Sequence, residues 1–263
     1  MRIALGIEYD GSRFTGWQTQ PGGGTVQDAV ESALSAIAGA RVVVTCAGRT
    51  DSGVHALGQV VHFDPPVERP TSAWVRGANA MLPDSVAILW AQPVPAAFHA
   101  RYSALSRRYR YLLVDRPVRP AIGAGRLGWF HQRLDVESMR AAARMVVGEH
   151  DFSAFRASEC QAKSPVRTIE SLEVARCGER VAFTICANAF LHHMVRNVVG
   201  CLVYVGAGRK PVAWMGEVLA SRDRGRAAPT FSAHGLYLEH VRYAPQWGLP
   251  DTADADAGAL AGA

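Results

Sequence analysis

The stretch AGRTDSGVHALGQ, residues 47–59, is a polar loop set between two short apolar runs. The run before it, residues 42–46, and the run after it, residues 60–64, are rich in β-branched residues, which is typical of strands. The loop holds one carboxylate, one guanidinium, two hydroxyls and one imidazole, and three glycines that permit tight turns. A polar loop held between two buried strands presents its side chains. We therefore predict that the active site lies here.

Outward from this loop, the hydrophobic pattern of residues 1–100 predicts the order β-α-β-β-α-β. Thr25 begins a helix with Asp28 at capping-box spacing, and Gly39 ends it. The Gly-rich loop over residues 13–24 is expected to be mobile, with aromatic side chains that either pack or stack on a base. The predicted strands are residues 2–9, 42–46, 60–64 and 86–90, and a second helix is predicted over 72–81.

The second half of the chain repeats roughly the same order. Its predicted strands are residues 107–114, 168–176, 180–187 and 236–241, and its predicted helices are 135–147, 191–205 and 212–221. We therefore predict an α+β fold of two ferredoxin-like, RRM-like half-domains, 1–100 with the Asp51 loop and 101–245 completing the active-site cleft. Their mainly antiparallel sheets are expected to merge into one central sheet flanked by helices. The tail, residues 246–263, is predicted to be disordered.

Composition excludes several classes of protein. Hydrophobic residues make up 49% of the 263, which excludes disorder of the whole chain. The longest apolar run, near residues 198–205, is far shorter than the ~20 residues that span a bilayer, and no signal peptide is expected at the N-terminus. The five cysteines are scattered and show no C-x-x-C spacing, so we expect reduced thiols in a cytoplasmic protein.

The positive charge of the chain comes almost entirely from arginine. The formal net charge is +5, and only Lys163 and Lys210 of the 28 cationic residues are lysines. A codon bias that replaces lysine by arginine explains this type of cation equally well, so placement carries more weight. Residues 101–126 hold seven arginines against one acid, Asp115. This segment is predicted to lie along a polyanion.

Asp51 is the strongest candidate in the polar loop. An Asp in a Gly-flanked loop is commonly a turn former or a helix cap. Arg49, two positions away, and the aliphatic flanks favour a desolvated carboxylate with a cation partner, able to act as nucleophile or base. Ser52 and His55 suggest a hydrolase, but catalytic triads are assembled from distant segments, and no G-x-S-x-G motif occurs.

A second polar stretch, NAFLHHMVRN, covers residues 188–197. Adjacent histidines on a helix point about 100° apart and cannot jointly chelate one metal, so no metal site is expected. Arg196, among valines, needs a carboxylate or an anion. An ordinary salt bridge and a pairing with Asp51 both remain open. Tyr109, on a strand between arginines, either packs or stacks on an unpaired base, a contact worth ~1–3 kcal/mol.

Several blocks of this sequence resemble, in the same order, the TruA-type tRNA pseudouridine synthases. Residues 48–56, GRTDSGVHA, are similar to the signature of that family, and the resemblance extends from about Ile3 to Tyr243. Ser52 is a departure, because alanine is usual there. The other blocks are residues 4–11, 16–18, 107–111, 151–155 and 188–200.

The resemblance implies the pseudouridine synthase fold and an isomerase that converts uridine to pseudouridine at positions 38, 39 and 40 of the tRNA anticodon stem-loop. It implies a cytoplasmic homodimer, with no metal, no organic cofactor and no membrane partner. Asp51 matches the catalytic aspartate, Tyr109 the tyrosine that stacks on the target base, and Arg196 the arginine paired with that aspartate. Arg49 matches a residue beside the flipped nucleotide. The alternative is a non-catalytic RNA-binding protein on the same scaffold.

Overall fold

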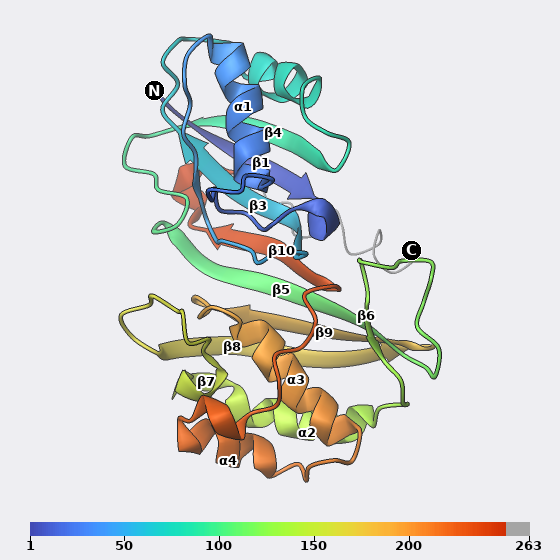
Figure 1. Cartoon of the computed structure of the whole chain (residues 1–263). Coiled ribbons are helices and arrows are strands. Elements are labelled where there is room, and N and C mark those ends of the chain that lie inside the picture. Colours follow the sequence, from blue (N-terminus) through green and yellow to red (C-terminus); the bar gives the residue numbers. More distant parts are fainter. Residues whose placement is uncertain (251–263) are drawn as a thin grey trace. The chain divides into compact units, whose positions relative to one another are not determined.

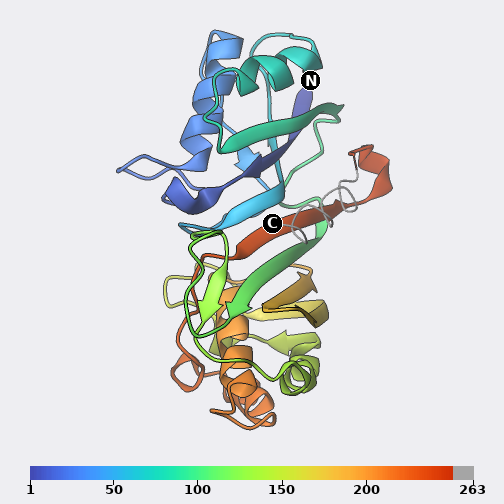
Figure 2. The same ribbon diagram turned by 90° about the vertical axis from the view of Figure 1, so that its right-hand side faces the viewer.

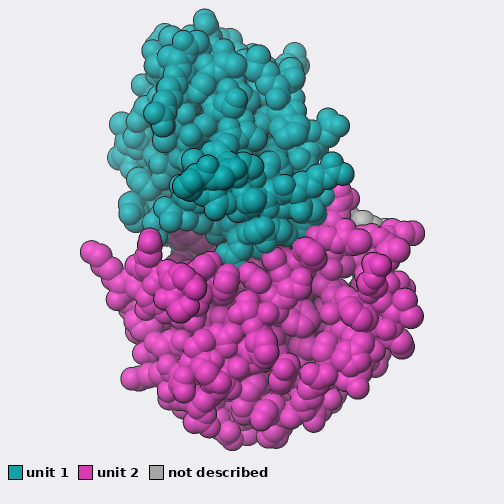
Figure 3. All heavy atoms as spheres, in the orientation of Figure 1, with its two compact units in different colours: residues 1–105, 237–263 teal, residues 106–236 magenta. Residues whose placement is uncertain are grey.

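The structure, a computed structural model, describes residues 1–250 and divides into two compact units (Figure 3). Unit 1 comprises residues 1–105 together with the C-terminal stretch from residue 237, and unit 2 comprises residues 106–236. Each unit is an α+β unit whose mostly antiparallel sheet is flanked by helices, which confirms the predicted fold class.

Unit 1 is built on a sheet with the strand order β4-β1-β3-β10. The central strand β1 pairs antiparallel with β3 on one side and with β4 on the other. Helix α1 covers one face of this sheet (Figures 1 and 2). The strands are β1 (Arg2–Tyr9), β3 (His55–Phe63), β4 (Val86–Val94) and β10 (Leu236–Tyr243).

Helix α1 (Val26–Ala38) forms as its sequence predicts. Thr25 accepts a hydrogen bond from the backbone of Asp28 while the Asp28 carboxylate accepts one from Thr25, so the capping box is complete. Gly39 ends the helix in the left-handed region, at φ 68°. Val30 and Leu34 are fully buried, which places the apolar stripe of the helix in the core.

The predicted strand over residues 42–46 is wrong in its first half. Only β2 (Thr45–Cys46) pairs with β3. The N–H of Val42 donates instead to Ser35 Oγ at 2.9 Å, and the N–H of Val44 donates to Glu31 Oε1 at 3.0 Å. Side chains of α1 therefore take the hydrogen bonds that a longer β2 would have used.

Strand β10 pairs with the part of β3 that the short β2 does not reach. It runs parallel to β3, with Tyr237 opposite His55 and Leu238 opposite Ala56, whereas β2 pairs at the other end with Val61 and His62. The sequence pattern predicts this last strand in the C-terminal half-domain, but Tyr237 and the residues after it group with unit 1. The predicted helix over 72–81 is present around a π-helical turn, η2 (Ala73–Gly77), which buries Trp74.

Unit 2 contains an antiparallel sheet with the order β5-β9-β8-β7, and β6 runs parallel to β5. The predicted strands over 168–176 and 180–187 are confirmed as β8 and β9, which pair antiparallel. Every second residue of β9 is buried, and Phe183 on β9 and Tyr111 on β5 are fully buried. The strands are β5 (Ala104–Asp115), β6 (Gly128–Phe130), β7 (Gly148–Asp151), β8 (Val166–Cys177) and β9 (Arg180–Ala187).

Three helices complete unit 2: α2 (Val136–Ala143), α3 (Met194–Gly206) and α4 (Trp214–Ser221). Helix α2 packs on α3 and β8 (Figure 1). The predicted helix over 135–147 begins where expected, capped by Asp135, but the α-helix ends at Ala143 and a 3-10 turn follows it. Helix α3 begins three residues later than predicted, at Met194.

The predicted tail starts at residue 246, but Trp247 belongs to a 3-10 turn, η6 (Pro245–Trp247), and its ring contacts Phe98 at 5.4 Å between centroids. The rest of that tail, 251–263, lies outside the described residues. Within residues 1–250, no helix is both long enough and apolar enough to cross a membrane.

Candidate active site

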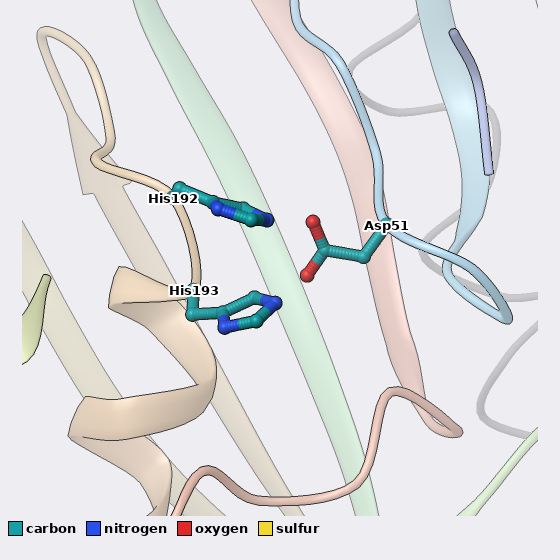
Figure 4. A group of neighbouring side chains, drawn as sticks. All are labelled: Asp51, His192 and His193. Atoms are coloured by element: carbon teal, nitrogen blue, oxygen red, sulfur yellow. The ribbon is translucent and has the colours of Figure 1, made fainter. Parts of the chain in front are cut away.

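Asp51 lies in a tight turn on the loop that leads into β3 (Figure 4). The N–H of Val54 donates to the Asp51 carbonyl at 3.1 Å, and Gly53 adopts φ 78° to close the turn. The Asp51 side chain is half-buried, between buried Thr50 and exposed Ser52. The carboxylate is thus carried by a short turn with little conformational freedom.

The base of this loop is fixed by Gln59, a fully buried residue of β3. Its Nε2 donates to the Gly48 carbonyl at 2.6 Å, and its Oε1 accepts from the Gly48 N–H at 3.4 Å. The N–H of Ala47 donates to the Val60 carbonyl at 2.8 Å. A buried amide that satisfies both backbone groups of one residue holds the loop against the strand.

The segment between β1 and α1 holds the loop from another side. The hydroxyls of Tyr9 and Thr50 lie 2.7 Å apart in a buried hydrogen bond, and the N–H of Trp17 donates to the Thr50 carbonyl at 3.0 Å. Trp17 is only 1% exposed, so the expectation of a mobile loop is wrong here and the packing alternative holds. A Cβ on Gly11 would lie 2.0 Å from the Val54 carbonyl oxygen, so this close approach requires glycine.

Ser52 and His55 have partners that give them structural roles. Ser52 Oγ donates to the Phe14 carbonyl at 3.2 Å. His55 is buried, its Nδ1 accepts from the Gly11 N–H at 3.1 Å, and its ring stacks on Tyr237 at 4.7 Å between centroids. Asp10 Oδ1 also lies 3.1 Å from this nitrogen, so Nδ1 is close to both a backbone donor and a carboxylate. These contacts leave Asp51 as the candidate catalytic group of the loop.

Arg49 is exposed. The role of Arg49 as the cation partner of Asp51 stays a prediction. Its charge acts on Cys46: burial raises the pKa of that thiol to about 11, and the Arg49 guanidinium opposes this rise.

Tyr109 lies on β5 in unit 2 and is 8% exposed. Its ring meets Phe190 edge-on, with centroids 5.0 Å apart and an interplanar angle of 82°. On the same face of the strand, the hydroxyl of Tyr111 donates to the Ser232 carbonyl at 3.1 Å. Burial raises the pKa of Tyr111 and the charge of Arg196 opposes this rise.

Arg196 occupies the first turn of α3 and is half-buried. Its Nε donates to the Phe231 carbonyl at 2.8 Å, and the N–H of Phe231 donates to the Arg196 carbonyl at 3.4 Å. The first bond orients the guanidinium, and the second holds the backbone of Phe231 against the first turn of α3. Since Asp51 belongs to unit 1 and Arg196 to unit 2, their pairing stays a prediction.

His192 and His193 do not lie on the helix. The argument that helix geometry points their side chains about 100° apart is therefore wrong. They form the turn before α3, His193 adopts φ 62°, and their ring centroids are 4.0 Å apart (Figure 4). The His192 carbonyl accepts from the Ala157 N–H at 3.0 Å, and its own N–H donates to Cys160 Sγ at 3.4 Å. These long-range bonds hold the chain outside the helix.

Asn197 is a positioning residue that sequence reasoning missed. It is fully buried, and its Nδ2 donates to the Phe155 carbonyl at 2.7 Å. Its Oδ1 accepts from Thr230 Oγ1 at 2.8 Å and from Arg224 Nη2 at 3.1 Å. One amide thus ties the first turn of α3 to the segment that carries Phe231. An Asn inside an apolar helix next to Arg196 was the available signal.

The arginines of residues 101–126 do not form one continuous array. Arg107 is buried and donates to the Asn188 carbonyl at 2.9 Å, and Arg116 pairs with Glu179 at 3.1 Å. Arg119 and Arg126 are exposed. Some of these arginines therefore bind other groups of the protein.

Comparison with known proteins assigns the family. A family model described as tRNA pseudouridine synthase matches residues 6–103 and 142–244. The chain is 59% identical over 254 residues to tRNA pseudouridine synthase A of Dechloromonas aromatica, covering 97% of both chains. It is 57% identical to the protein of that name from Albidiferax ferrireducens, covering 95% of this chain and 96% of the relative.

The chain belongs to the tRNA pseudouridine synthase family. The residues that carry the turn of Asp51 and the first turn of α3 lie within the matched ranges. Tyr109 lies in the stretch 104–141, which the family model does not match, although relatives cover it.

Proposed function

We propose that this protein converts uridine to pseudouridine in tRNA, with Asp51 as the catalytic carboxylate. The observation that carries the proposal is the turn of Asp51: hydrogen bonds from β3 and from the β1–α1 segment fix it, within a range that matches the family. A fixed carboxylate on a rigid loop is the arrangement that transition-state stabilisation requires.

The reaction is an isomerisation. The bond between C1′ of the ribose and N1 of the uracil breaks, the uracil turns, and a bond forms between C1′ and C5. The hydrogen on C5 leaves as a proton and N1 gains one, so no oxidant, reductant or second substrate is consumed. A stacked uridine cannot turn in this way, so the nucleotide must leave the helix or loop stack, as in other base-modifying enzymes.

Asp51 acts on the released nucleotide by adding to the uracil, by attacking C1′, or by assisting elimination. All three routes need an oxygen of the carboxylate held at a constant position. The tight turn closed by Val54 and Gly53 supplies that position.

The other proposed roles follow from the local geometry in each unit. Tyr109, held edge-on by Phe190, offers a ring on which the extruded uracil stacks. Arg196, oriented by Phe231, pairs with the Asp51 carboxylate and keeps it charged. Exposed Arg49 contacts the phosphate backbone beside the target nucleotide.

We also propose that the targets are positions 38, 39 and 40 of the anticodon stem-loop and that the protein acts in the cytoplasm as a homodimer. The block resemblance to TruA-type enzymes supports all three statements. The five free cysteines agree with a reducing compartment.

The test is tritium release from tRNA labelled at C5 of uridine, together with mapping of pseudouridine in the product. We expect Asp51→Asn to lower turnover by about 10³-fold or more, because an amide can neither attack nor accept a proton. Binding of tRNA should stay within about twofold, since the two side chains have the same shape. Asp84→Asn, at an exposed carboxylate far from the loop in sequence, is the matched control.

Substantial turnover by Asp51→Asn would refute the catalytic role of this residue. Tight tRNA binding without tritium release by the unaltered protein would favour the non-catalytic RNA-binding alternative.

A further inference from the structure

Unit 2 carries a basic surface beside β6 that the proposed site does not use. We call it the β6 surface and define it as residues 116–133 together with Arg209 and Lys210. Residues 116–133 include four arginines and His131 but no Asp or Glu. The family model leaves residues 104–141 unmatched, and this stretch includes residues 116–133.

Contacts at β6 join the ends of the β5–β6 loop to the residues that follow α3. The N–H of Arg116 donates to the Phe130 carbonyl at 3.1 Å, and Trp129 Nε1 donates to the Arg116 carbonyl at 2.9 Å. Arg209, which follows α3, lies over the Phe130 ring at 5.3 Å from its centroid. One end of α3 and both ends of the β5–β6 loop therefore meet at β6.

Aromatic rings rather than carboxylates hold the two cations after α3. Arg209 lies 5.3 Å from the ring centroids of both Phe130 and Tyr204, and Lys210 lies 5.5 Å from that of Trp214. Both side chains are exposed, and within residues 1–250 neither forms an ion pair. A cation–π contact fixes the position of a charge without neutralising it.

The same surface exposes large apolar side chains. Ile122 is 93% exposed, Val118 is 72% exposed and Trp129 is 39% exposed. Two of the four arginines of residues 116–133 pair with acidic residues outside that segment, at 3.1 and 3.6 Å. Exposed apolar groups beside exposed cations are typical of nucleic-acid surfaces, where the cations contact phosphates and the apolar groups contact bases or sugars.

A helix C-terminus favours cations through its dipole, and this accounts for Arg209 and Lys210 in part. It does not account for the exposed Arg119 and Arg126 on the β5–β6 loop, nor for the lack of acidic residues along that loop. A ligand with many negative charges accounts for all of these features together.

We propose that the β6 surface binds backbone phosphates of the tRNA substrate, away from the reacting nucleotide. The proposal rests on the proposed function only in naming tRNA as the polyanion. The thirteen residues of α3 span about 20 Å, which separates the β6 surface from Arg196 at the other end of the helix. The surface therefore contributes to tRNA affinity through a part of the RNA other than the target uridine.

The experiment measures the dissociation constant of an unmodified tRNA transcript over a series of salt concentrations. Two double variants remove separate halves of the surface: Arg209→Gln with Lys210→Gln, and Arg119→Gln with Arg126→Gln. The matched control, Arg41→Gln with Arg144→Gln, removes two exposed arginines elsewhere and changes the net charge equally.

We expect each β6 double variant to weaken tRNA binding by about 2- to 30-fold. We also expect the plot of log K against log salt to become shallower by about 1.5 to 2, because two phosphate contacts are lost. The control should keep the slope and the affinity of the unaltered protein. The variant at Arg119 and Arg126 lies outside α3, so a loss of affinity in it cannot come from destabilising that helix. Thermal unfolding measures the stability of both double variants.

Slopes and affinities equal to those of the control in both β6 variants would overturn the proposal. A change in molar mass by light scattering would also overturn it, because the surface would then be a subunit contact. Tritium release by the unaltered protein is measured separately, so a failure of the proposed function is recognised without reference to these slopes.

Discussion

The loop of Asp51 in unit 1 and the first turn of α3 in unit 2 are fixed in different ways. Hydrogen bonds reach the loop from three separate residues, Gln59, Tyr9 and Trp17. In the first turn of α3, one buried amide, that of Asn197, makes three hydrogen bonds by itself. We therefore expect the loop to tolerate loss of one side chain but not a backbone clash, whereas the first turn of α3 should be sensitive to loss of this one side chain.

The largest effect is expected at Asn197. Asn197→Ala leaves the Phe155 carbonyl, Thr230 and Arg224 without their shared partner inside unit 2. We expect a loss of about 3 kcal/mol in the free energy of unfolding, since each buried group left unpaired costs about 1–3 kcal/mol. Chemical denaturation measures this loss, with Gln132→Ala, at an exposed amide side chain, as the control. A loss below about 1 kcal/mol would show that the turn is not held by this amide.

The next effect tests the backbone contact in unit 1. Gly11→Ala places a Cβ 2.0 Å from the Val54 carbonyl oxygen, so the turn of Asp51 must shift. Overpacking of this kind costs about 1–3 kcal/mol, and we expect turnover to fall by more than the change in stability explains. Gly22→Ala is the control, because nothing lies within 4 Å of its added Cβ. Unchanged turnover in Gly11→Ala would contradict a rigid loop.

Tyr109 should show a smaller and graded effect. Tyr109→Phe keeps the ring that contacts Phe190 and should retain most of the turnover. Tyr109→Leu removes the ring, and we expect kcat/KM to fall by about 5- to 150-fold, the equivalent of the ~1–3 kcal/mol that base stacking contributes. Equal losses in both variants would assign the role to the hydroxyl instead.

The smallest effect is expected at Ser52. Its hydroxyl makes an exposed hydrogen bond to the Phe14 carbonyl, one of several that hold the loop. Ser52→Ala should change stability by less than about 0.5 kcal/mol and turnover by less than about twofold. Measured loss of turnover by orders of magnitude would revive the hydrolase hypothesis for this loop.

Local chemistry made part of this structure predictable. Helix α1 has its capping box, its apolar stripe and its terminal glycine within fifteen residues, so its bounds could be predicted from Thr25 to Gly39. The turn of Asp51 was likewise marked by glycines and by flanking apolar runs. In both cases the residues that decide the conformation are close together in the sequence.

The predictions from sequence are wrong where residues far apart in the chain decide the conformation. Residues 42–44 have a strand-like sequence, but Ser35 and Glu31 of α1 bind their backbone. His192 and His193 lie outside α3 because Ala157 and Cys160 bind the backbone of His192. The role of Asn197 depends on three partners from other elements, none of which is near it in the sequence.

The position of β10 has a consequence for how the chain folds during synthesis. Residues 1–105 leave the ribosome first, but the edge of β3 at His55 and Ala56 finds its partner only when Tyr237 and Leu238 emerge. Until then this edge presents unpaired backbone groups, which favour association with other nascent chains. Unit 2 is thus an insertion that must be translated in full before the first unit can close, and a truncated N-terminal fragment should aggregate rather than remain monomeric.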